Sequence, residues 1–509
     1  MKIKLIFILS IAISFLSFSQ NNNNILSIAS EELENRLLGN SIGESYVKDN
    51  ELWIGTSRGL SKTTDDGITW QNFLTVKEFT KPNISSLIIW GDTIFTSLAY
   101  TKVVPPLGNV VTGDGFTISS DGGKSWVHYP QAKDDIADTI ITYGINKIPT
   151  VAVIVDEQNI TYDCSIFQNT IWIASWSSGI RKSTNLGETF ERVVLPPDNL
   201  FSIHPNDTLS FRIHPVLQNN HVAFAVLAVD SLEIWAGTAD GVNKSTDGGI
   251  SWRKFNSLSR KSWIVGDWVI HINQQKYKDK NRIWTTNWKS DTIKRDYGGS
   301  ISYTEDGGET WTSFTLLNER RGTNYLAFKD SIIYVATSIG IFRSDNDGKS
   351  FELFDNFYDK TNGNKVLYPE VYTISISGDK IWFGTSDGLV STIDNADTKF
   401  GTEWSIKRTY QPMKANSAYA YPNPFSPSYE MIRINYTMPK NSCNVSIDIF
   451  DFGMNHIRTI FNNIKSGSLT QEDIWDGLDN NSKLVANGVY FYRIRIDSED
   501  IWGKILVLK

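Results

Sequence analysis

The sequence predicts an all-β protein, a seven-bladed β-propeller followed by a small Ig-like β-sandwich. A short turn motif recurs six times along the chain, and each copy follows two short β-rich runs joined by a glycine turn. The last part of the chain lacks the motif and alternates apolar and polar residues instead. Recurrence of one unit at intervals of tens of residues is typical of repeat folds, in which each unit packs against its neighbours.

The composition indicates a folded protein of more than one domain. At 509 residues the chain is too long for one compact domain, and 40% of its residues are hydrophobic. The formal net charge of −7 argues against nucleic acid as a partner, because little positive charge is available to neutralise phosphates. The two cysteines, Cys164 and Cys443, fall in different predicted domains, so we expect no disulfide between them.

The N-terminus has the pattern of a signal peptide over residues 1–19. Lys2 and Lys4 precede an apolar run at residues 5–18, and small residues stand near its end. A membrane anchor is the alternative, although the run is short for a span. No later segment is apolar enough to cross a membrane, so we expect an exported protein without a span in its mature form.

The turn motif reads Ser or Thr, any residue, Asp or Asn, any residue, Gly, any residue, Ser or Thr, and then an aromatic residue. The acidic or amide side chain is expected to accept hydrogen bonds from nearby backbone N–H groups and so to fix a tight turn. We predict this structural role, rather than calcium binding or catalysis, for Asp65, Asp121, Asn185, Asp247, Asp306 and Asn346.

The motif resembles the Asp box of the sialidase, sortilin and xyloglucanase propellers. Two-strand phrases precede it, for example at residues 51–60 and 233–242, and one further strand before each phrase gives four strands per unit. A seventh phrase at residues 380–389 lacks a clean motif. The sequence therefore predicts seven blades over residues 25–410.

Residues 411–420 are predicted as a linker and residues 421–509 as the sandwich. Alternating strands are expected at the positions where β-branched and aromatic residues recur with period two, namely 432–436, 445–450, 489–496 and 504–509.

This tail resembles the type A C-terminal sorting domain of the type IX secretion system, which is related to the Ig-like domain of flagellar hook-capping proteins. The residues that carry the resemblance include Asn423, Pro424, Phe425, Gly488, Tyr490 and Lys504. The resemblance implies the type IX machinery as a partner, transport across an outer membrane, and attachment to the cell surface or release. A plain adhesion module without a sorting role is the alternative.

In Asp-box propellers the box occupies one rim, and ligands use the opposite rim. Residues 97–115 are predicted as a long loop on that rim, and residues 139–159 are long enough to form their own hairpin. Trp176 and Trp288 occupy equivalent places where most repeats have a small residue, which suits stacking on a sugar or peptide. Ordinary packing is the alternative. The candidate ligand-binding residues are Tyr100, Trp176, Trp288, Asp291, Arg295, Asp296, Arg320 and Tyr358.

The enzymatic alternatives have weaker support. Residues 211–215 partly match the Arg-containing motif of sialidases but follow the third box, and a xyloglucanase would need two propellers. The six histidines show no metal-ligand spacing, so we predict neither metal nor cofactor. A glycan-, peptide- or protein-binding propeller without catalysis is therefore expected, with a glycoside hydrolase as the alternative. Converging carboxylates would distinguish the two, and the candidate acids are Asp114, Asp291 and Asp296.

Overall fold

The computed structural model describes residues 36–258, 264–288, 299–317, 322–366, 368–409, 418–427, 430–440, 442–466 and 470–508. The predicted signal peptide lies outside them. The described residues form strands and loops and one short 3-10 turn, η2 (Asn219–His221), which confirms the all-β prediction. None of these residues belongs to a helix with the length and hydrophobicity needed to span a membrane. The chain divides into a larger unit, 26–360 with 364–409, and a smaller unit that includes 410–509.

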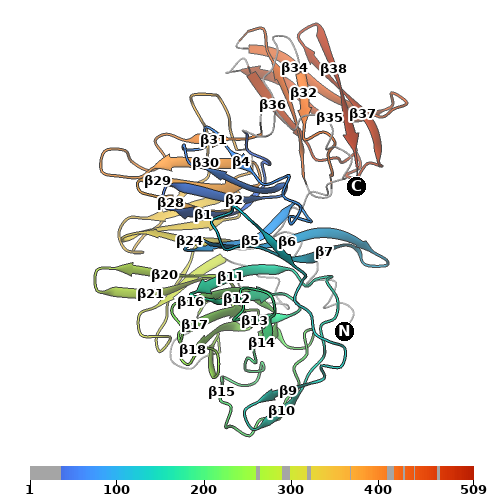
Figure 1. Ribbon diagram of the computed structural model, residues 1–509. Coiled ribbons are helices and arrows are strands. Elements are labelled where there is room, and N and C mark those ends of the chain that lie inside the picture. Colours follow the sequence, from blue (N-terminus) through green and yellow to red (C-terminus); the bar gives the residue numbers. More distant parts are fainter. Residues whose placement is uncertain are drawn as a thin grey trace. The chain divides into compact units, whose positions relative to one another are not determined.

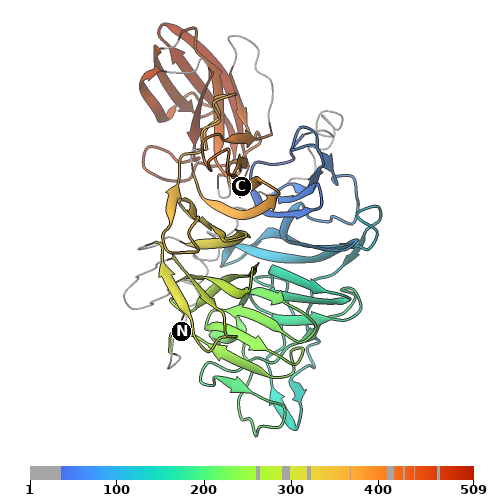
Figure 2. The same cartoon turned by 90° about the vertical axis from the view of Figure 1, so that its left-hand side faces the viewer.

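In the described residues the larger unit contains seven large antiparallel sheets and one two-stranded hairpin, and each large sheet includes four consecutive strands in chain order (Figures 1 and 2). The first three sheets contain β1 (Ile42–Lys48), β2 (Glu51–Thr56), β3 (Gly59–Thr63) and β4 (Gln71–Asn72); β5 (Asn83–Trp90), β6 (Thr93–Val104), β7 (Gly108–Ser119) and β8 (Val127–Tyr129); and β11 (Thr161–Phe167), β12 (Thr170–Ser175), β13 (Gly179–Ser183) and β14 (Glu191–Arg192).

The fourth sheet has a fifth strand on its outer edge, β15 (Ser202–Ile203), which the sequence did not predict. The other strands of the last four sheets are β16 (Ala223–Ala228), β17 (Ile234–Thr238), β18 (Gly241–Ser245) and β19 (Trp252–Phe255); β20 (Trp268–Tyr277), β21 (Lys280–Trp288), β22 (Gly299–Thr304) and β23 (Thr312–Thr315); β24 (Thr323–Lys329), β25 (Ile332–Thr337), β26 (Gly340–Ser344) and β27 (Glu352–Phe354); and β28 (Val371–Ser377), β29 (Lys380–Thr385), β30 (Gly388–Ile393) and β31 (Ser405–Lys407).

The first strands of the seven sheets close a ring. They contact one another in the order β1, β5, β11, β16, β20, β24, β28 and back to β1. The closure between the last and first sheets includes hydrogen bonds between the Ser45 hydroxyl and the hydroxyls of Thr373 at 2.9 Å and Ser375 at 2.8 Å. A closed ring of radially arranged four-stranded sheets is a β-propeller, so this fold prediction is confirmed. We call these seven strands the inner strands.

A repeated aromatic residue fills the space between neighbouring sheets. It lies on the second strand of each sheet, and the seven side chains are at most 2% exposed: Trp53, Phe95, Trp172, Trp235, Trp284, Tyr334 and Trp382. The turn of the following sheet packs against this ring. A Cβ atom on Gly249 would come within 2.5 Å of the Trp172 ring, so the motif needs glycine there both for space and for its positive φ.

Of two predictions about irregular segments, one is confirmed and the other is wrong. The expected hairpin within 139–159 is confirmed as β9 (Ile140–Tyr143) and β10 (Asn146–Pro149), which pair antiparallel. The prediction of a long loop at 97–115 is wrong, because β6 and β7 continue through most of this segment and pair as far as Val104 and Gly108. Thr101, Val103 and Val110 favour an extended backbone there, and this explains the difference.

The smaller unit has two antiparallel sheets around one core. One sheet has the order β32 (Ala418–Tyr421), β33 (Ile432–Thr437), β36 (Thr470–Trp475), and the other β35 (His456–Ser466), β34 (Ser442–Phe450), β37 (Gly488–Ile496), β38 (Glu499–Val507). Side chains of both sheets, such as Ile434 and Ile447, share a single hydrophobic cluster. Strand β32 includes residues 418–420, which the sequence placed in the linker.

The residues that carry the tail resemblance have structural contacts. The Asn423 side chain accepts a hydrogen bond from Leu506 N and donates one to Lys504 O, both at 2.8 Å. Phe425 is buried and its backbone pairs with β38. Tyr490 packs on Trp475 with ring centroids 5.5 Å apart. The Asn-Pro-Phe segment therefore anchors the start of this unit to its last strand.

Candidate functional site

The six motif turns use their carboxylate or amide groups internally. In the fourth sheet, Asp247 Oδ1 accepts hydrogen bonds from Ile250 N at 3.1 Å and Ser251 N at 2.8 Å, while Oδ2 accepts one from the Ser251 hydroxyl at 2.6 Å. Equivalent bonds form at the other motif turns, at Asp65, Asp121, Asn185, Asp306 and Asn346. These are the hydrogen bonds that the predicted role as turn anchors requires. We call the end of the ring that carries these turns the box rim.

The hydrogen bonds also set the charge of these turns. Bonds from the side chain and backbone N–H of Thr69 lower the pKa of Asp65 to about 2. The seventh sheet lacks the motif, but Asn395 Oδ1 accepts bonds from Asp397 N at 3.0 Å and Thr398 N at 2.7 Å, so a reduced form of the turn persists. The box rim therefore holds ionised, fully engaged carboxylates and offers little for a ligand.

The opposite end of the ring is distinguished by bulges. Every inner strand has a one-residue register shift near its start, and such bulges re-aim the adjacent side chains. The unpaired residues, which we call the bulge level, are Gly43, Ser85, Tyr162, Phe224, Ile270, Asn324 and Tyr372. The residues that follow them, which we call the polar level, are Glu44, Ser86, Asp163, Ala225, His271, Tyr325 and Thr373.

Four aromatic rings meet at this end, and we call them the aromatic cluster: Tyr162, Trp176, Phe224 and Trp268. Phe224 lies at its centre, 5.9 Å from Tyr162, 5.6 Å from Trp176 and 5.5 Å from Trp268 between ring centroids. Trp176 and Trp268 also meet edge to face at 6.2 Å. Phe224 is buried, whereas the other three rings are partly exposed. The cluster joins three neighbouring sheets.

The loop that carries Trp176 is fixed from three sides. Its backbone N–H donates to Ile160 O at 3.3 Å, and the Ser177 hydroxyl donates to Gln158 O at 2.8 Å. His221 Nε2 lies 2.9 Å from Ser177 O, as a hydrogen bond. Burial lowers the pKa of His221 to about 4, so this imidazole is neutral near neutral pH and a neutral donor suffices for the contact.

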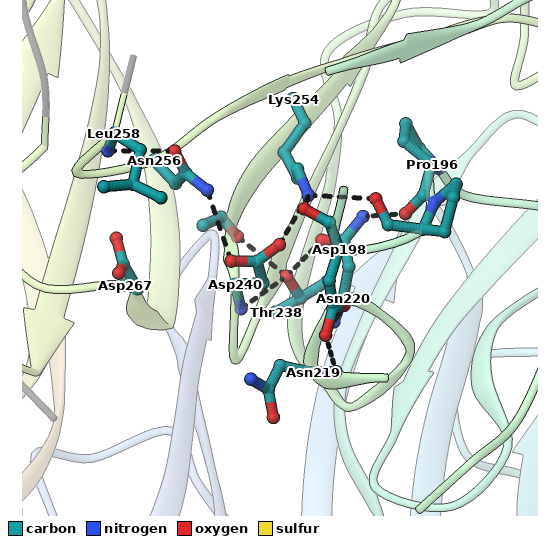
Figure 3. Close-up of polar contacts among 12 residues, drawn as sticks. Pro196, Asp198, Asn219, Asn220, Thr238, Asp240, Lys254, Asn256, Leu258 and Asp267 are labelled. Carbon is teal, nitrogen blue, oxygen red and sulfur yellow. Dashed lines mark hydrogen bonds and ion pairs between the residues drawn. The ribbon is translucent and has the colours of Figure 1, made fainter. Parts of the chain in front are cut away.

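A buried amide fixes the segment that leads to Phe224 (Figure 3). Asn220 Nδ2 donates to Pro196 O at 2.6 Å, and its Oδ1 accepts from the Thr238 hydroxyl at 2.7 Å and from Asn243 Nδ2 at 2.9 Å. Asn220 is 1% exposed. A fully hydrogen-bonded buried amide holds one backbone arrangement, because any shift would leave polar atoms unpaired.

Further polar contacts surround Lys254 and, separately, Asp267 at the start of β20 (Figure 3). Lys254 Nζ is buried and bonds to Asp198 O at 3.0 Å, to Pro197 O at 3.1 Å and to the Asp240 carboxylate. Asp267, next to Trp268, accepts bonds from the N–H and hydroxyl of Ser257, both at 2.8 Å. Lys254 has three partners, so its role is to fix the rim.

Two carboxyl groups of the polar level interact inside the ring. Burial raises the pKa of Asp163 to about 7, although its carboxylate accepts bonds from Cys164 N at 2.8 Å and Val226 N at 2.9 Å. Burial, and then the charge of Asp163, raise the pKa of Glu44 well above its usual range. The pKa of Tyr325 is also raised, by burial and then by Glu44 and Asp163. Groups from three separate sheets therefore influence one another across the inner strands.

His271 completes this level. Its ring stacks on Tyr325 with centroids 3.8 Å apart, and burial lowers its pKa to about 3. Its Nε2 atom has no hydrogen-bond partner among the residues described. Burial therefore raises the pKa values of Asp163 and Glu44 at the polar level and lowers that of His271, whereas hydrogen bonds lower the pKa of Asp65 at the box rim.

Of the predicted ligand-binding residues that the structure describes, Trp176 belongs to the aromatic cluster. Trp288 donates its indole N–H to Thr323 O at 3.0 Å and covers Gly322. Tyr100 lies under Lys81 Nζ at 4.7 Å from its centroid, and Tyr358 is 40% exposed. The other four, Asp291, Arg295, Asp296 and Arg320, lie outside the described residues.

The two acids that influence each other electrostatically, Glu44 and Asp163, are not those the sequence favoured. Asp114 bonds to the Thr80 hydroxyl, and Asp291 and Asp296 lie outside the described residues. Glu44 and Asp163 were missed because they stand within strands rather than loops. A carboxylate in the first strand of a predicted blade was the available signal, since such a residue is costly to bury without a reason.

No metal site is evident in the part of the chain that the structure describes, where no three His, Cys, Asp or Glu side chains are grouped to hold an ion. Cys164 and Cys443 are both buried and free.

No protein-family model and no curated protein matches this chain. Solved structures do. YCF48 from Cyanidioschyzon merolae is 17% identical with a TM-score of 0.43 and covers 70% of this chain and 96% of its own. PorZ, a surface component of the type-IX secretion system of Porphyromonas gingivalis, is 13% identical with a TM-score of 0.34, over 92% and 66% of the two chains. The GH74 xyloglucanase of Xanthomonas campestris is 10% identical with a TM-score of 0.48, over 93% and 74%. At these values the propeller assignment rests on the strand pairing of this chain.

Proposed function

We propose that this chain is an exported binding protein, whose propeller holds a ligand at the aromatic cluster and does no chemistry on it. The observation that carries the proposal is the cluster itself, in which partly exposed Tyr162, Trp176 and Trp268 surround buried Phe224. Aromatic side chains supply large contact area with little conformational entropy to lose. The cluster lies at the end of the ring opposite the turns that the repeat conserves.

Preorganisation of the site supports the same conclusion. Asn220, Lys254 and His221 are fully engaged in holding the three segments that carry the aromatic rings. A site whose side chains are already fixed loses less entropy when a ligand binds. Buried polar networks of this kind, at an end of the fold where the repeats differ, favour binding as the role of that end.

Glycoside hydrolysis is the second candidate, and it is favoured by the electrostatic influence of Asp163 on Glu44, which contributes to the raised pKa of Glu44. Such enzymes need one protonated carboxyl group and one ionised carboxylate at the same pH. Here the pKa values of both groups are raised, that of Asp163 to about 7. Binding without cleavage is therefore the better account. Cleavage of a polysaccharide that disappears in Asp163→Asn or Glu44→Gln would overturn it.

Delivery to the cell surface, or release, by a type IX secretion system is the second part of the proposal. Its support is the tail resemblance, together with the anchoring of Asn423 and Phe425 to β38, which makes these motif residues integral to a folded unit. The test removes residues 418–509, because β32 begins at Ala418. In a type IX-secreting host the truncated chain is expected to stay in the periplasm. Undiminished surface delivery would refute the sorting role.

Binding is tested with the full chain on a combined glycan and peptide array, followed by titration of any hit. Trp176→Ala and Trp268→Ala are each expected to weaken binding at least ~10-fold, the usual loss at an aromatic anchor. Trp90→Ala is the matched control, because Trp90 is 44% exposed and lies at the other end of its sheet. Equal affinities of all three variants and the parent would place the ligand elsewhere.

A further inference from the structure

Cations from the chain's own side chains lie over most of the aromatic residues that recur between the propeller sheets. A Lys or Arg side chain is between 4.3 and 6.0 Å from the ring centroid at five of them: Trp53, Trp172, Trp235, Trp284 and Trp382. A cation within about 6 Å of an aromatic ring is attracted by the negative face of its π system. Among the described residues, none of the four rings of the aromatic cluster has such a partner, although three of these rings are partly exposed. The cluster can therefore receive a cation from outside the chain.

The segments that carry the aromatic cluster contain acidic residues and no basic ones. In residues 158–163, 175–179, 221–226 and 265–270 the acids are Asp163 and Asp267, and Lys and Arg are absent. Burial raises the pKa of Asp163 to about 7, so the partly exposed Asp267 is the main negative charge. Consecutive α-carbons are about 3.8 Å apart, so the Asp267 carboxylate lies within roughly 11 Å of the ring of its neighbour Trp268, close to the screening length of about 10 Å at 0.1 M salt. This charge favours a positive ligand.

Cations of the neighbouring sheets are held inside the fold. The side chains of Arg181 and Arg192 are 2% and 9% exposed, and both contact the Asp134 carboxylate, at 2.6 and 3.1 Å. The Lys254 side chain is 0% exposed and is paired with Asp240 (Figure 3). A buried and paired cation cannot turn outward without leaving its partner uncompensated. These three side chains therefore do not compete for the aromatic cluster.

We propose that the aromatic cluster binds an arginine side chain of a partner polypeptide, with the guanidinium group against Trp176 and Trp268 and attracted by Asp267. This rests on the proposed binding function and names the ligand class of that site. The guanidinium group is planar, is more weakly hydrated than an ammonium group and stacks on aromatic rings. Arginine is therefore the cation that suits this surface best.

The packing of the rings selects a polypeptide over a small free cation. Trp176, Phe224 and Trp268 lie 5.6, 5.5 and 6.2 Å from one another between centroids, which is the spacing of rings in direct contact. No cation fits between rings at this spacing, so the ligand lies against their outer side. Contact on one side only needs further contact area from the rest of the ligand, and an extended polypeptide supplies it across the three sheets that the cluster joins.

The experiment uses the full chain and a library of heptapeptides in which the central residue is arginine and the flanking residues vary. The tightest binder is synthesised again with citrulline, lysine or glutamate at the centre, and calorimetry measures each affinity. Citrulline has the shape of arginine without its charge, so its peptide is expected to bind at least ~10-fold more weakly. The lysine peptide is expected to fall between these two, and the glutamate peptide to bind more weakly than the citrulline peptide.

Variants of the chain separate the rings from the charge. Trp268→Ala is expected to weaken binding of the arginine peptide at least ~10-fold, and Trp268→Phe less, because phenylalanine keeps a weaker π face. Asp267→Asn, which can keep hydrogen bonds to Ser257, is expected to weaken binding about 3-fold at low salt and to match the parent at about 0.5 M salt. Glu352→Gln makes the same change of charge at an exposed position on β27 and is the control. Thermal unfolding verifies that each variant is folded.

The outcomes separate this inference from the function beneath it. Selectivity for arginine that requires Trp176 and Trp268 supports both. Equal affinities of the arginine and citrulline peptides, or an Asp267→Asn variant that behaves as Glu352→Gln at low salt, overturn the arginine inference. Binding of a glycan or a neutral peptide through the two tryptophans, with none for arginine peptides, also overturns it and leaves the binding function intact. Absence of any ligand that depends on the two tryptophans overturns both.

Discussion

The two ends of the propeller ring treat carboxyl groups in opposite ways. At the box rim, Asp65 and its equivalents accept several hydrogen bonds each, and those bonds lower the pKa of Asp65 to about 2. At the polar level, burial raises the pKa of Asp163 to about 7 and that of Glu44 well above its usual range. The carboxylates of the box rim use their charge to accept hydrogen bonds within their own turns. The carboxyl groups of the polar level are instead shifted by burial inside the ring.

This contrast indicates which end of the ring can differ from sheet to sheet without loss of the fold. The box rim is nearly identical from sheet to sheet because one turn is required of every blade for packing, as with Gly249 against Trp172. All seven inner strands have the same one-residue register shift at the bulge level. The side chain there differs between sheets, for example Gly43 in β1 and Tyr162 in β11. Because the backbone is shared and only the side chains differ, the architecture stays intact while one end of the ring varies.

The largest expected effect comes from the box rim in acid, because four aspartates act together. Their pKa values are lowered in the folded state, so their contribution to stability is complete above the unfolded value near 4 and is lost as the pH falls toward 2. Replacing Asp65, Asp121, Asp247 and Asp306 together by Asn is expected to lower the midpoint of acid unfolding by on the order of half a pH unit.

The variant is expected to fold, because Asn185 and Asn346 already fill this position in two sheets. The measurement is circular dichroism of the full chain between pH 5 and pH 1.5. Parent and variant with the same acid midpoint would show that the box carboxylates do not carry the acid sensitivity.

Much of the fold could be predicted because its signals are local. The motif turns, the hairpins such as β2–β3 and the glycine positions are each contained within about ten residues. The aromatic residue after each turn stands at a fixed distance from the motif, so it can be found in the sequence. The extension of β6 and β7 was missed for a related reason, since a strand and a β-rich loop differ only in whether a partner is in register.

The candidate site could be predicted only in part, because it depends on contacts between distant segments. Trp176 was found because it breaks the pattern of its own repeat. Tyr162, Phe224 and Trp268 were missed because each is ordinary in its strand and gains a role only where three sheets meet. Register shifts of one residue decide which side chains face one another, and no local pattern fixes them.

The next effect tests the other end of the comparison, near neutral pH. Because the pKa of Asp163 is raised in the folded state, the folded protein binds more protons than the unfolded chain between about pH 4 and pH 7, and its contribution to stability declines as the pH rises through that window. Asp163→Asn is expected to make this decline shallower, by less than the about 1.4 kcal/mol per pH unit of a full proton.

His221 and His271 have lowered pKa values and give the opposite slope between about pH 4 and 6.5, so the quantity to compare is the difference between variant and parent. Urea unfolding at pH 5, 6, 7 and 8 measures it. The acid transition below pH 4 is the internal control, because Asp163→Asn leaves the box rim unchanged. Parallel profiles of variant and parent from pH 5 to 8 would contradict the assignment.

The smallest effect isolates a single box and asks whether the two ends are independent. Asp247→Ala removes the acceptor of Ile250 N, Ser251 N and two hydroxyls, and is expected to lower the free energy of unfolding by about 1–3 kcal/mol. Asp247→Asn keeps Oδ1 as the acceptor and can donate to the Ser251 hydroxyl, as Asn185 does to Thr189, so its loss is expected to be less than half as large.

Ligand affinity at the aromatic cluster should match the parent in both variants, because the turn lies at the other end of the same sheet. Denaturant titration and calorimetry measure the two quantities on one preparation. A change in affinity that follows the loss of stability would mean that the box rim shapes the site as well as the blade, and the division between the two ends would no longer hold.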